Sequence, residues 1–477
     1  MGKENYIPAQ QSQGGPYTVD KELSAYVTQV GRRLAKVSDR PKLPYEFVVL
    51  NNNVPNAWAL PGGKIAVNRG LLLELKNEAE LAAVLGHEIV HSAARHGAKS
   101  MERGMILNAG VVGLGVALGN DNNADLIMGA AGLGASLISQ KYGRDAELES
   151  DHYGMKYMAK AGYNPQAAVA LQETFVRLSQ GRQSNWLEGL FASHPPSQER
   201  VAANRKYAKK LGNKGVLAEQ EYLAKIAHLK KTQPAYAAYK NGLKALADNK
   251  PDEAFKQAKL AIDIEPREGM FYSLQGETWL SKGADNKEKA EASFTQALRY
   301  SADYFLPHLQ RGLVRLKLKN DPGAKTDLEA SIKLLPTAPA YLGLGDLAVK
   351  AGDEQQAVDY YRHASASKSD IGKLAAIKLA RLDLPKHPEK YLTTSIALNQ
   401  QDNIVITVNN QSAVDVANVN LEVRLITPSG QMITKKSLLL RERIQTNSSV
   451  TIDSGLTLLS DSKTRVGIQI TQAHIAE

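Results

Sequence analysis

The chain of 477 residues contains no cysteine. This absence excludes disulfide staples, cysteine-ligated zinc and iron–sulfur sites, and catalysis by a thiol nucleophile. Any metal ion must therefore be held mainly by His, Asp or Glu side chains. The lack of cysteine also fits an exported protein, because stray thiols are a liability in an oxidising compartment.

Long apolar runs are missing as well. The two most apolar stretches, residues 105–118 and 126–138, are rich in glycine and alanine but fall short of the ~20 residues that span a bilayer. They are predicted to form two helices, either packed in the core or resting on a membrane surface. Residues 1–17 lack a basic start followed by an apolar stretch. We expect a periplasmic protein whose leader is not part of this sequence.

The charge balance is only modestly basic. Lys and Arg number 59 against 49 Asp and Glu, a formal net charge of +10. The basic residues are spread through helical stretches, as on solvated helix faces, so nucleic-acid binding is not expected. Contact with an anionic membrane surface or an acidic partner stays open. The length predicts two to four domains, and 43% hydrophobic residues allow each to bury a core.

Pattern changes along the chain predict a mainly helical protein of several domains. Residues 1–16 are polar and expected to be disordered. Residues 17–205 mix helical periodicity with two short strands, 45–50 and 64–67, as in an α+β domain. Residues 206–232 read as a helical linker.

Residues 233–385 contain an internal repeat. A glycine recurs at intervals near 34 residues, and an alanine follows each glycine at a similar distance. This period indicates tetratricopeptide repeats, in which small residues allow paired helices to pack closely. We therefore predict an α-solenoid. The glycines and alanines are Gly242, Gly276, Gly312 and Gly345, then Ala254, Ala290, Ala324 and Ala357.

Residues 390–477 change character again. Five segments alternate apolar and polar residues between turns rich in Asn, Ser, Gly and Asp. This pattern predicts a C-terminal antiparallel β-sandwich. The segments are 404–408, 420–425, 431–440, 449–452 and 465–470.

The chemistry is concentrated in His87-Glu88-Ile-Val-His91, within a helix predicted from residue 78 to about residue 95. Residues i and i+4 share a helix face, so His87 and His91 can both direct imidazole nitrogens at one zinc ion. Glu88 lies beside them and can act on water without ligating the metal. The alternative is an amphipathic helix with two solvated histidines, which the apolar neighbours disfavour.

A third ligand must come from elsewhere in the chain. The metzincin continuation of this motif is absent, and His96 is expected on the surface, pointing away from the site. Glu147 and Asp151 lie one turn apart on a second predicted helix, which suits a ligand with a supporting carboxylate. Glu149 is expected to point elsewhere.

Four motifs together resemble the HtpX-like gluzincin zinc metallopeptidases. They are the His-Glu-x-x-His motif, Glu147 with Asp151, the Asn-Ala-Trp-Ala-Leu-Pro-Gly-Gly of residues 56–63, and Ser-His-Pro-Pro at 193–196 followed by Arg200. The repeats make the chain look most like the branch that serves β-barrel assembly in the outer membrane. The resemblance covers about residues 17–384. The C-terminal sandwich has no counterpart in the assembly-related branch. The membrane helices of HtpX itself are absent from this sequence.

The resemblance implies roles for individual residues. His87, His91 and Glu147 would bind one zinc ion per chain, Glu88 would be the general base and acid, and Asp151 would orient a ligand histidine. Strand 64–67 would be a sheet edge that pairs with the substrate backbone. His194, with Arg200 nearby in sequence, would either stabilise the oxyanion or cap the zinc as a fourth ligand in a latent state; a plain helix cap is the alternative.

The favoured function is therefore a zinc metalloendopeptidase, latent until activated, that degrades misfolded or stalled exported and outer-membrane proteins. The repeats would bind protein clients or an outer-membrane assembly complex. The rival function is a chaperone or scaffold of envelope assembly with a capped zinc site. The intact Glu88 favours the enzyme, because a purely structural zinc site would not need it.

Overall fold

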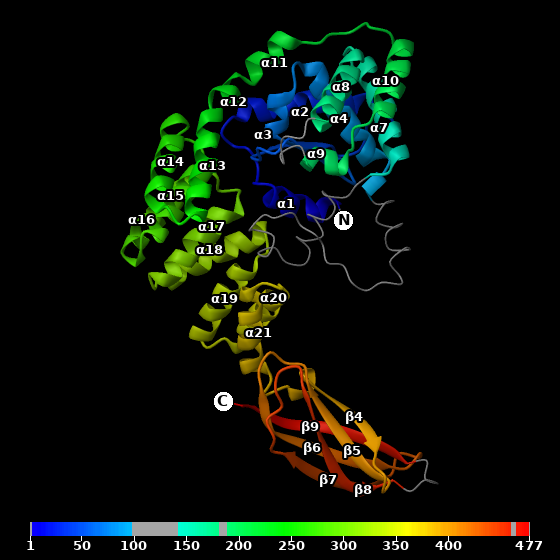
Figure 1. The fold of residues 1–477 in the computed structure, drawn as a ribbon, viewed down its shortest axis with the longest axis vertical. Coiled ribbons are helices and arrows are strands. Elements are labelled where there is room, and N and C mark those ends of the chain that lie inside the picture. Colours follow the sequence, from blue (N-terminus) through cyan, green and yellow to red (C-terminus); the bar gives the residue numbers. More distant parts are fainter. Residues whose placement is uncertain (1, 98–141, 181–187, 459–463, 477) are drawn as a thin grey trace. The chain divides into compact units, whose positions relative to one another are not determined.

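A computed structural model describes residues 2–97, 142–180, 188–458 and 464–476. The chain divides into two compact units, Met1–Pro336 and Thr337–Glu477, and Figure 1 shows their helices and strands. None of the helices in the described ranges is long and apolar enough to cross a bilayer. The two apolar segments predicted at 105–118 and 126–138 lie outside the described residues.

The first unit is built on a small three-stranded sheet with the order β1-β3-β2. β1 (Glu46–Leu50) runs parallel to β3 (Lys64–Asn68), and β2 (Ala57–Leu60) runs antiparallel to β3. The expectation that 64–67 is a sheet edge is therefore wrong, because β3 is hydrogen-bonded on both sides. The two edge strands of this sheet are β1 and β2. The turn into β3 uses Gly62 and Gly63, whose φ angles of 91° and 85° suit glycine.

Helices cover both faces of this sheet. Alternate strand residues such as Ala59 and Ile65 join a large core with α2 (Lys21–Lys36) and α4 (Glu78–Ala93). The other face, which includes Trp58, packs against α1 (Gly2–Ser12). Tyr6 of α1 meets Trp58 edge-on at 6.1 Å and donates a hydrogen bond to the carbonyl of Ile65. Residues 2–12 are thus helical rather than disordered, because the sheet supplies an apolar surface that local composition does not reveal.

Three further helices complete the surroundings of α4. They are α7 (Arg144–Lys160), α8 (Gln166–Gln180) and α10 (Gln198–Leu211), with the short α3 (Arg69–Glu74) and α9 (Glu188–Ser193) at the periphery. α4 and α7 cross where Gly86 faces Gly154. A Cβ on Gly154 would lie 3.0 Å from the amide nitrogen of His87. Glycine therefore allows the two helices to approach closely beside His87.

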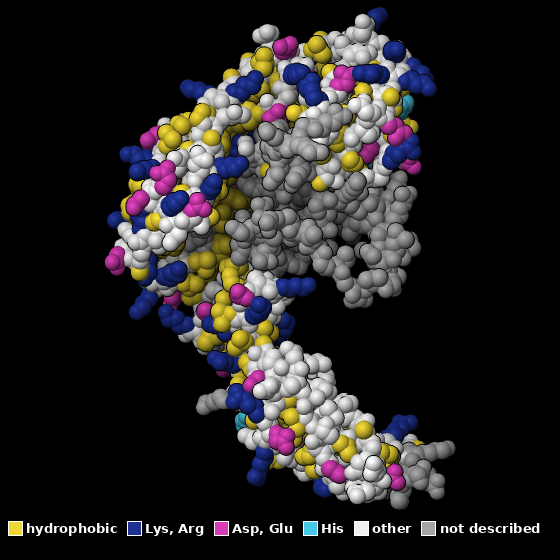
Figure 2. All heavy atoms as spheres, in the orientation of Figure 1, with side chains coloured by type: hydrophobic (Ala, Val, Ile, Leu, Met, Phe, Trp, Pro, Cys, Tyr) yellow, Lys and Arg dark blue, Asp and Glu magenta, His cyan; other side chains and the backbone are white. Residues whose placement is uncertain are grey.

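The repeat region consists of antiparallel helix pairs, preceded by α11 (Glu219–Lys225) and α12 (Ala227–Lys231). The repeated glycines lie on the first helix of each pair, and a methyl group on Gly276 would overlap the ring of Phe294. The four repeated alanines are fully buried. The pairs are α13 (Gln233–Ala247) with α14 (Pro251–Ile264), α15 (Gly269–Ser281) with α16 (Lys287–Tyr300), α17 (Phe305–Lys317) with α18 (Asp321–Leu334), and α19 (Ala338–Lys350) with α20 (Glu354–Ser365). Figure 2 shows Lys and Arg side chains scattered over α10–α18 rather than gathered in one patch.

A buried polar cluster joins the sheet region to the repeats within the first unit. Arg69, 3% exposed, stacks on the ring of Tyr236 at 3.4 Å and donates from Nε to Asn51. Asn51 and Tyr236 each donate to Oε2 of Glu268, both at 2.8 Å. Gln11 adds hydrogen bonds to the backbone at the start of α17. These contacts fix the first repeats against the sheet region.

The second unit contains α19 and α20, α21 (Asp370–Asp383), and two three-stranded antiparallel sheets with the orders β4-β5-β8 and β7-β6-β9. One hydrophobic cluster is shared by strands of both sheets. Five strands coincide with predicted segments, whereas β4 was not predicted. The strands are β4 (Leu392–Leu398), β5 (Asn403–Asn410), β6 (Val416–Ile426), β7 (Met432–Leu440), β8 (Ser449–Thr457) and β9 (Arg465–Ile475).

Candidate active site

The helix that carries the His-Glu-x-x-His motif begins at a well-defined cap. Asn77 accepts a hydrogen bond from the amide of Glu80 through its side chain, as an N-cap residue does. From this start, α4 runs without interruption to Ala93 and brings His87 and His91 onto one face. Both histidines and Glu88 are buried.

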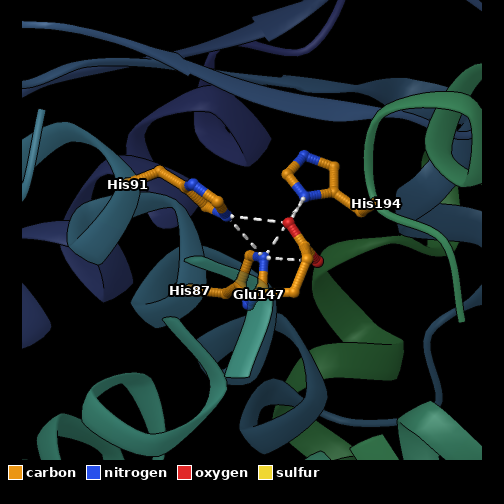
Figure 3. Close-up of side chains that lie close together, drawn as sticks. All are labelled: His87, His91, Glu147 and His194. Carbon is orange, nitrogen blue, oxygen red and sulfur yellow. Dashed lines mark hydrogen bonds and ion pairs between the residues drawn. The ribbon is translucent and has the colours of Figure 1, made fainter. Parts of the chain in front are cut away.

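Four side chains from two helices and one loop converge at this face (Figure 3). His87 and His91 approach each other at 2.9 Å through their Nε2 atoms. Glu147, from α7, lies 3.3 Å from His91 Nε2, and His194, just after α9, lies 3.1 Å from Glu147 Oε1. One ligand atom from each of the four lies within 4.8 Å of the others.

The donor set fits zinc. Three imidazole nitrogens and a carboxylate oxygen are the ligands that zinc takes in tetrahedral protein sites. Their spacing of about 3 Å is that expected between ligands each about 2 Å from one ion. Among the described residues, Oε2 of Glu88 is buried without a hydrogen-bond partner, so this carboxylate is ready to receive a group brought by substrate or solvent.

Burial and neighbouring charges set the protonation of the cluster. Burial lowers the pKa of His91 well below its ordinary value, which favours the neutral ligand form. Burial by itself raises the pKa of Glu147, but His194 and His87 outweigh it and hold that pKa far below the usual range. Burial also raises the pKa of Glu88. A carboxyl group of this kind can hold a proton closer to neutral pH than an exposed glutamate.

Asp151 and Arg200 each contact a residue of the ligand cluster. Asp151 Oδ1 lies 2.9 Å from Nδ1 of His87, which leaves Nε2 of that ring facing the other ligands. Arg200 donates to both oxygens of Asp151 at 2.7 and 2.8 Å and reaches Glu147 Oε2 at 2.7 Å. Asn204 adds a fourth contact to Asp151 at 3.2 Å. Arg200 is thus placed against two carboxylates, those of Asp151 and Glu147.

His96 lies inside this region, contrary to expectation. It is 6% exposed, its Nδ1 is 3.1 Å from Nδ1 of His91, and its Nε2 is 3.4 Å from Glu149. The helical spacing failed because α4 ends before it, and Arg95 adopts a left-handed conformation (φ 59°) that turns the chain back. Glu149 does point away from the four ligands, as expected. It contacts His96, which in turn contacts His91.

Tyr142 is a site residue that the sequence pattern did not reveal. Its ring lies 4.0 Å from that of His91 and 5.2 Å from that of His194, centroid to centroid. Burial raises its pKa, so the phenol stays protonated at neutral pH. A small cavity of about 40 Å³ adjoins Glu88 and His194 and has apolar walls that include Leu171 and Phe175.

Residues 21–208 match the model of peptidase family M48. The β-barrel assembly-enhancing protease of Escherichia coli K12 is 28% identical over 316 residues, which cover 60% of this chain and 64% of that protein. The metalloprotease YcaL of the same organism is 30% identical over 191 residues, 38% of this chain and 70% of that protein.

Among solved structures, a thermophilic tetratricopeptide protein of Thermus thermophilus covers 45% of this chain and 99% of that chain at 19% identity and a TM-score of 0.28.

The chain spans somewhat under two thirds of the length of the assembly-enhancing protease of Escherichia coli K12. The match of residues 21–208 contains the whole ligand cluster and Arg200. The chain belongs to peptidase family M48.

Proposed function

We propose that this protein is a zinc metalloendopeptidase with its active site at His87, His91 and Glu147. The observation that carries the proposal is the buried convergence of these ligands with Glu88 beside them. Zinc bound there would polarise the scissile carbonyl and lower the pKa of water at the site.

In this proposal Glu88 performs the proton transfers. Its carboxylate takes a proton from the attacking water and passes it to the leaving amine. The raised pKa that burial gives Glu88 supports the second step, because the protonated acid must persist until the amine leaves. Asp151 holds the tautomer of His87 through the 2.9 Å contact, and Arg200 keeps Asp151 ionised.

The test is a Glu88→Gln variant assayed on casein. We expect a loss of activity of about 100-fold or more, because general acid–base catalysis contributes on that scale. Glu173→Gln is the matched control, since Glu173 is half-exposed and pairs with the exposed Arg205. Full activity in the Glu88 variant, with contaminating proteases excluded, would rule out this mechanism.

We further propose that His194 caps the zinc as a fourth ligand and keeps the resting enzyme latent. The support is its Nδ1 atom, 3.1 Å from Glu147 and 3.3 Å from His87. His194→Ala is then expected to increase caseinolysis. An unchanged rate would count against the latch. A lower rate would favour the other role, in which His194 stabilises the oxyanion and its pKa, raised by Glu88 and Glu147 against the effect of burial, keeps it cationic.

The relatives support a proposal about clients and location. The matched relative named for β-barrel assembly supports a periplasmic enzyme that degrades misfolded or stalled exported and outer-membrane proteins. We propose that residues 17–205 form the peptidase domain, 206–232 the linker, 233–385 a tetratricopeptide solenoid that binds clients or an outer-membrane assembly complex, and 390–477 a β-sandwich. Contact with a membrane surface is part of this proposal.

The second candidate is a scaffold of envelope assembly whose zinc site stays capped, and the burial of His194 favours it. Rescue of an assembly defect separates the two functions. A scaffold would rescue equally as wild type and as Glu88→Gln, whereas the peptidase would rescue only as wild type.

A further inference from the structure

The C-terminal sheets have one edge strand without the usual protection. β4, of sequence Leu-Thr-Thr-Ser-Ile-Ala-Leu, contains no charged residue and no proline and pairs with β5 without a register shift. Natural edge strands normally carry charges, prolines or bulges that prevent pairing with other chains. The other three edge strands have such devices. β7 has Lys435 and Lys436, β8 has Asp453 and a register shift, and β9 has Arg465 and two register shifts.

The backbone of β4 is oriented to accept another strand. The amide of Asn399 donates to the carbonyl of Asn403, and the amide of Gln411 donates to the carbonyl of Tyr391. These two bonds flank β4, so its odd-numbered residues exchange hydrogen bonds with β5. The backbone groups of its even-numbered residues therefore point to the outer side. No strand among the described residues pairs there.

The side chains of the same even-numbered residues leave the core uncovered at this edge. Leu392 is buried in the cluster that the two sheets share, but Ile396 and Leu398 are 46% and 48% exposed. Their partners across the strand pair, Ile406 and Ile404, are completely buried. The apolar face therefore continues beyond β5 and reaches solvent at β4.

The facing sheet does not close this side. β7 contacts β8, so those two edges lie together, and the opposite edges, β4 and β9, lie on the other side. On β9, Val466 and Ile468 are only partly buried. An added strand beside β4 would cover apolar side chains of both sheets.

We propose that the β4 edge binds an extended segment of another polypeptide by strand addition. The backbone of β4 would supply the hydrogen bonds, and alternate apolar side chains of the incoming segment would pack on Ile396 and Leu398. The partner is thus an uncharged strand with an alternating apolar pattern. Its identity as a peptidase client rests on the proposed function, whereas the pairing itself does not.

A second copy of this chain fits the edge less well. Antiparallel self-pairing that sets Ile396 against Leu398 of the other copy has its centre at Ala397, one residue from the end of β4. Only residues 396–398 of each strand would then pair. The register centred on Ile396 pairs residues 394–398, but it sets Leu398 against Thr394. Leu392 is 2% exposed, so a separate segment pairs along the same residues 394–398, and it can place an apolar side chain beside both Ile396 and Leu398.

The test measures binding of a fluorescein-labelled peptide by anisotropy. The probe has about eight residues, the length of a typical strand, with alternating Val and Thr and blocked ends. A second probe has the same composition with the valines grouped together. The full chain carries Glu88→Gln so that cleavage does not interfere, and the variants are Ile396→Lys and Thr394→Pro. The matched control is Ile433→Lys, which places the same charge at a 54% exposed position on the lysine-bearing strand β7.

We expect the alternating probe to bind the parent protein and the Ile433→Lys control equally, and both β4 variants about tenfold more weakly or worse. The grouped probe should bind less well than the alternating one. Equal binding by all variants, or no binding by the parent protein, would refute the proposal. Sedimentation equilibrium that shows a dimer abolished by Ile396→Lys would assign the edge to a second copy instead. Because binding is measured without catalysis, failure of the peptidase assay and failure of this test are independent.

Discussion

Replacing Arg200 by methionine should destabilise the ligand cluster by a few kcal/mol in metal-free protein. Arg200 is 5% exposed and holds Asp151 and Glu147 through three contacts of 2.7–2.8 Å. Burial alone would raise the pKa of Asp151, but Arg200, with a smaller contribution from His87, lowers it from 3.8 to about 2. A shift of slightly under two pKa units corresponds to about 2–3 kcal/mol, and breaking a buried ion pair costs about 3–5 kcal/mol. The expected loss at pH 7 is therefore about 2–5 kcal/mol.

The pH dependence of this loss has a definite sign. A carboxylate whose pKa is depressed by folding stabilises the protein above its unfolded pKa, and this contribution disappears as pH falls through the folded pKa. For Asp151 the interval runs from about 4 down to about 2. The difference between wild type and Arg200→Met should thus be complete at pH 7 and smallest near pH 2.

Hydrogen exchange in the presence of a chelator measures this effect locally, which matters because a chain with two compact units need not unfold in one step. Peptides from α7 and α10 should lose protection in Arg200→Met. Arg205→Met is the control on the same helix, since Arg205 is exposed and pairs with exposed Glu173; its effect should stay within about 0.5 kcal/mol. Equal protection of α7 in the two variants would refute the reasoning.

Other perturbations test the neighbouring features. Gly276→Ala should lower repeat stability by about 1–3 kcal/mol because the methyl group overlaps Phe294, while Gly143→Ala, which meets nothing within 4 Å, should not; thermal unfolding compares them. His96→Ala should weaken zinc retention about tenfold in competition with a chelator, because His96 contacts the ring of His91 at 3.1 Å, and unchanged retention would contradict a supporting role. Dialysis against a chelator should abolish proteolysis yet leave the unfolding of the C-terminal sheets unchanged.

The sequence pattern was informative where one helix determines the geometry. His87 and His91 lie on one face because they are four residues apart, and Glu147 and Asp151 share a face of α7 for the same reason. The structure brings these residues together as expected. The repeated glycines were also recognisable, because the tight contact of paired helices excludes larger side chains at those positions.

The pattern failed where the outcome depends on distant parts of the chain. Strand order is not encoded in any one strand, so β3 was taken as an edge although it lies between β1 and β2. The helix at residues 2–12 depends on a surface that includes Trp58. His96 depends on the reversal at Arg95, and Tyr142 on a fold that brings it beside His91.

The missed strand β4 has a related explanation. Its segment Leu392–Leu398 is mostly exposed on both faces, so alternation between buried and exposed positions is weak. The alternation rule detects strands that are already covered on one face. An edge that is still open to another strand is the kind of element that this rule overlooks.

The buried cluster around Arg69 bears on how the protein could be dissected. A fragment that ends after α10 would leave Arg69 without the ring of Tyr236, and Asn51 without Glu268. The peptidase portion is therefore not expected to be stable as a separate fragment, since its sheet region shares buried polar groups with the first repeats. Insertions or deletions that change the length of α11 and α12 would strain these contacts, so the distance between catalytic centre and first repeats is expected to tolerate little variation.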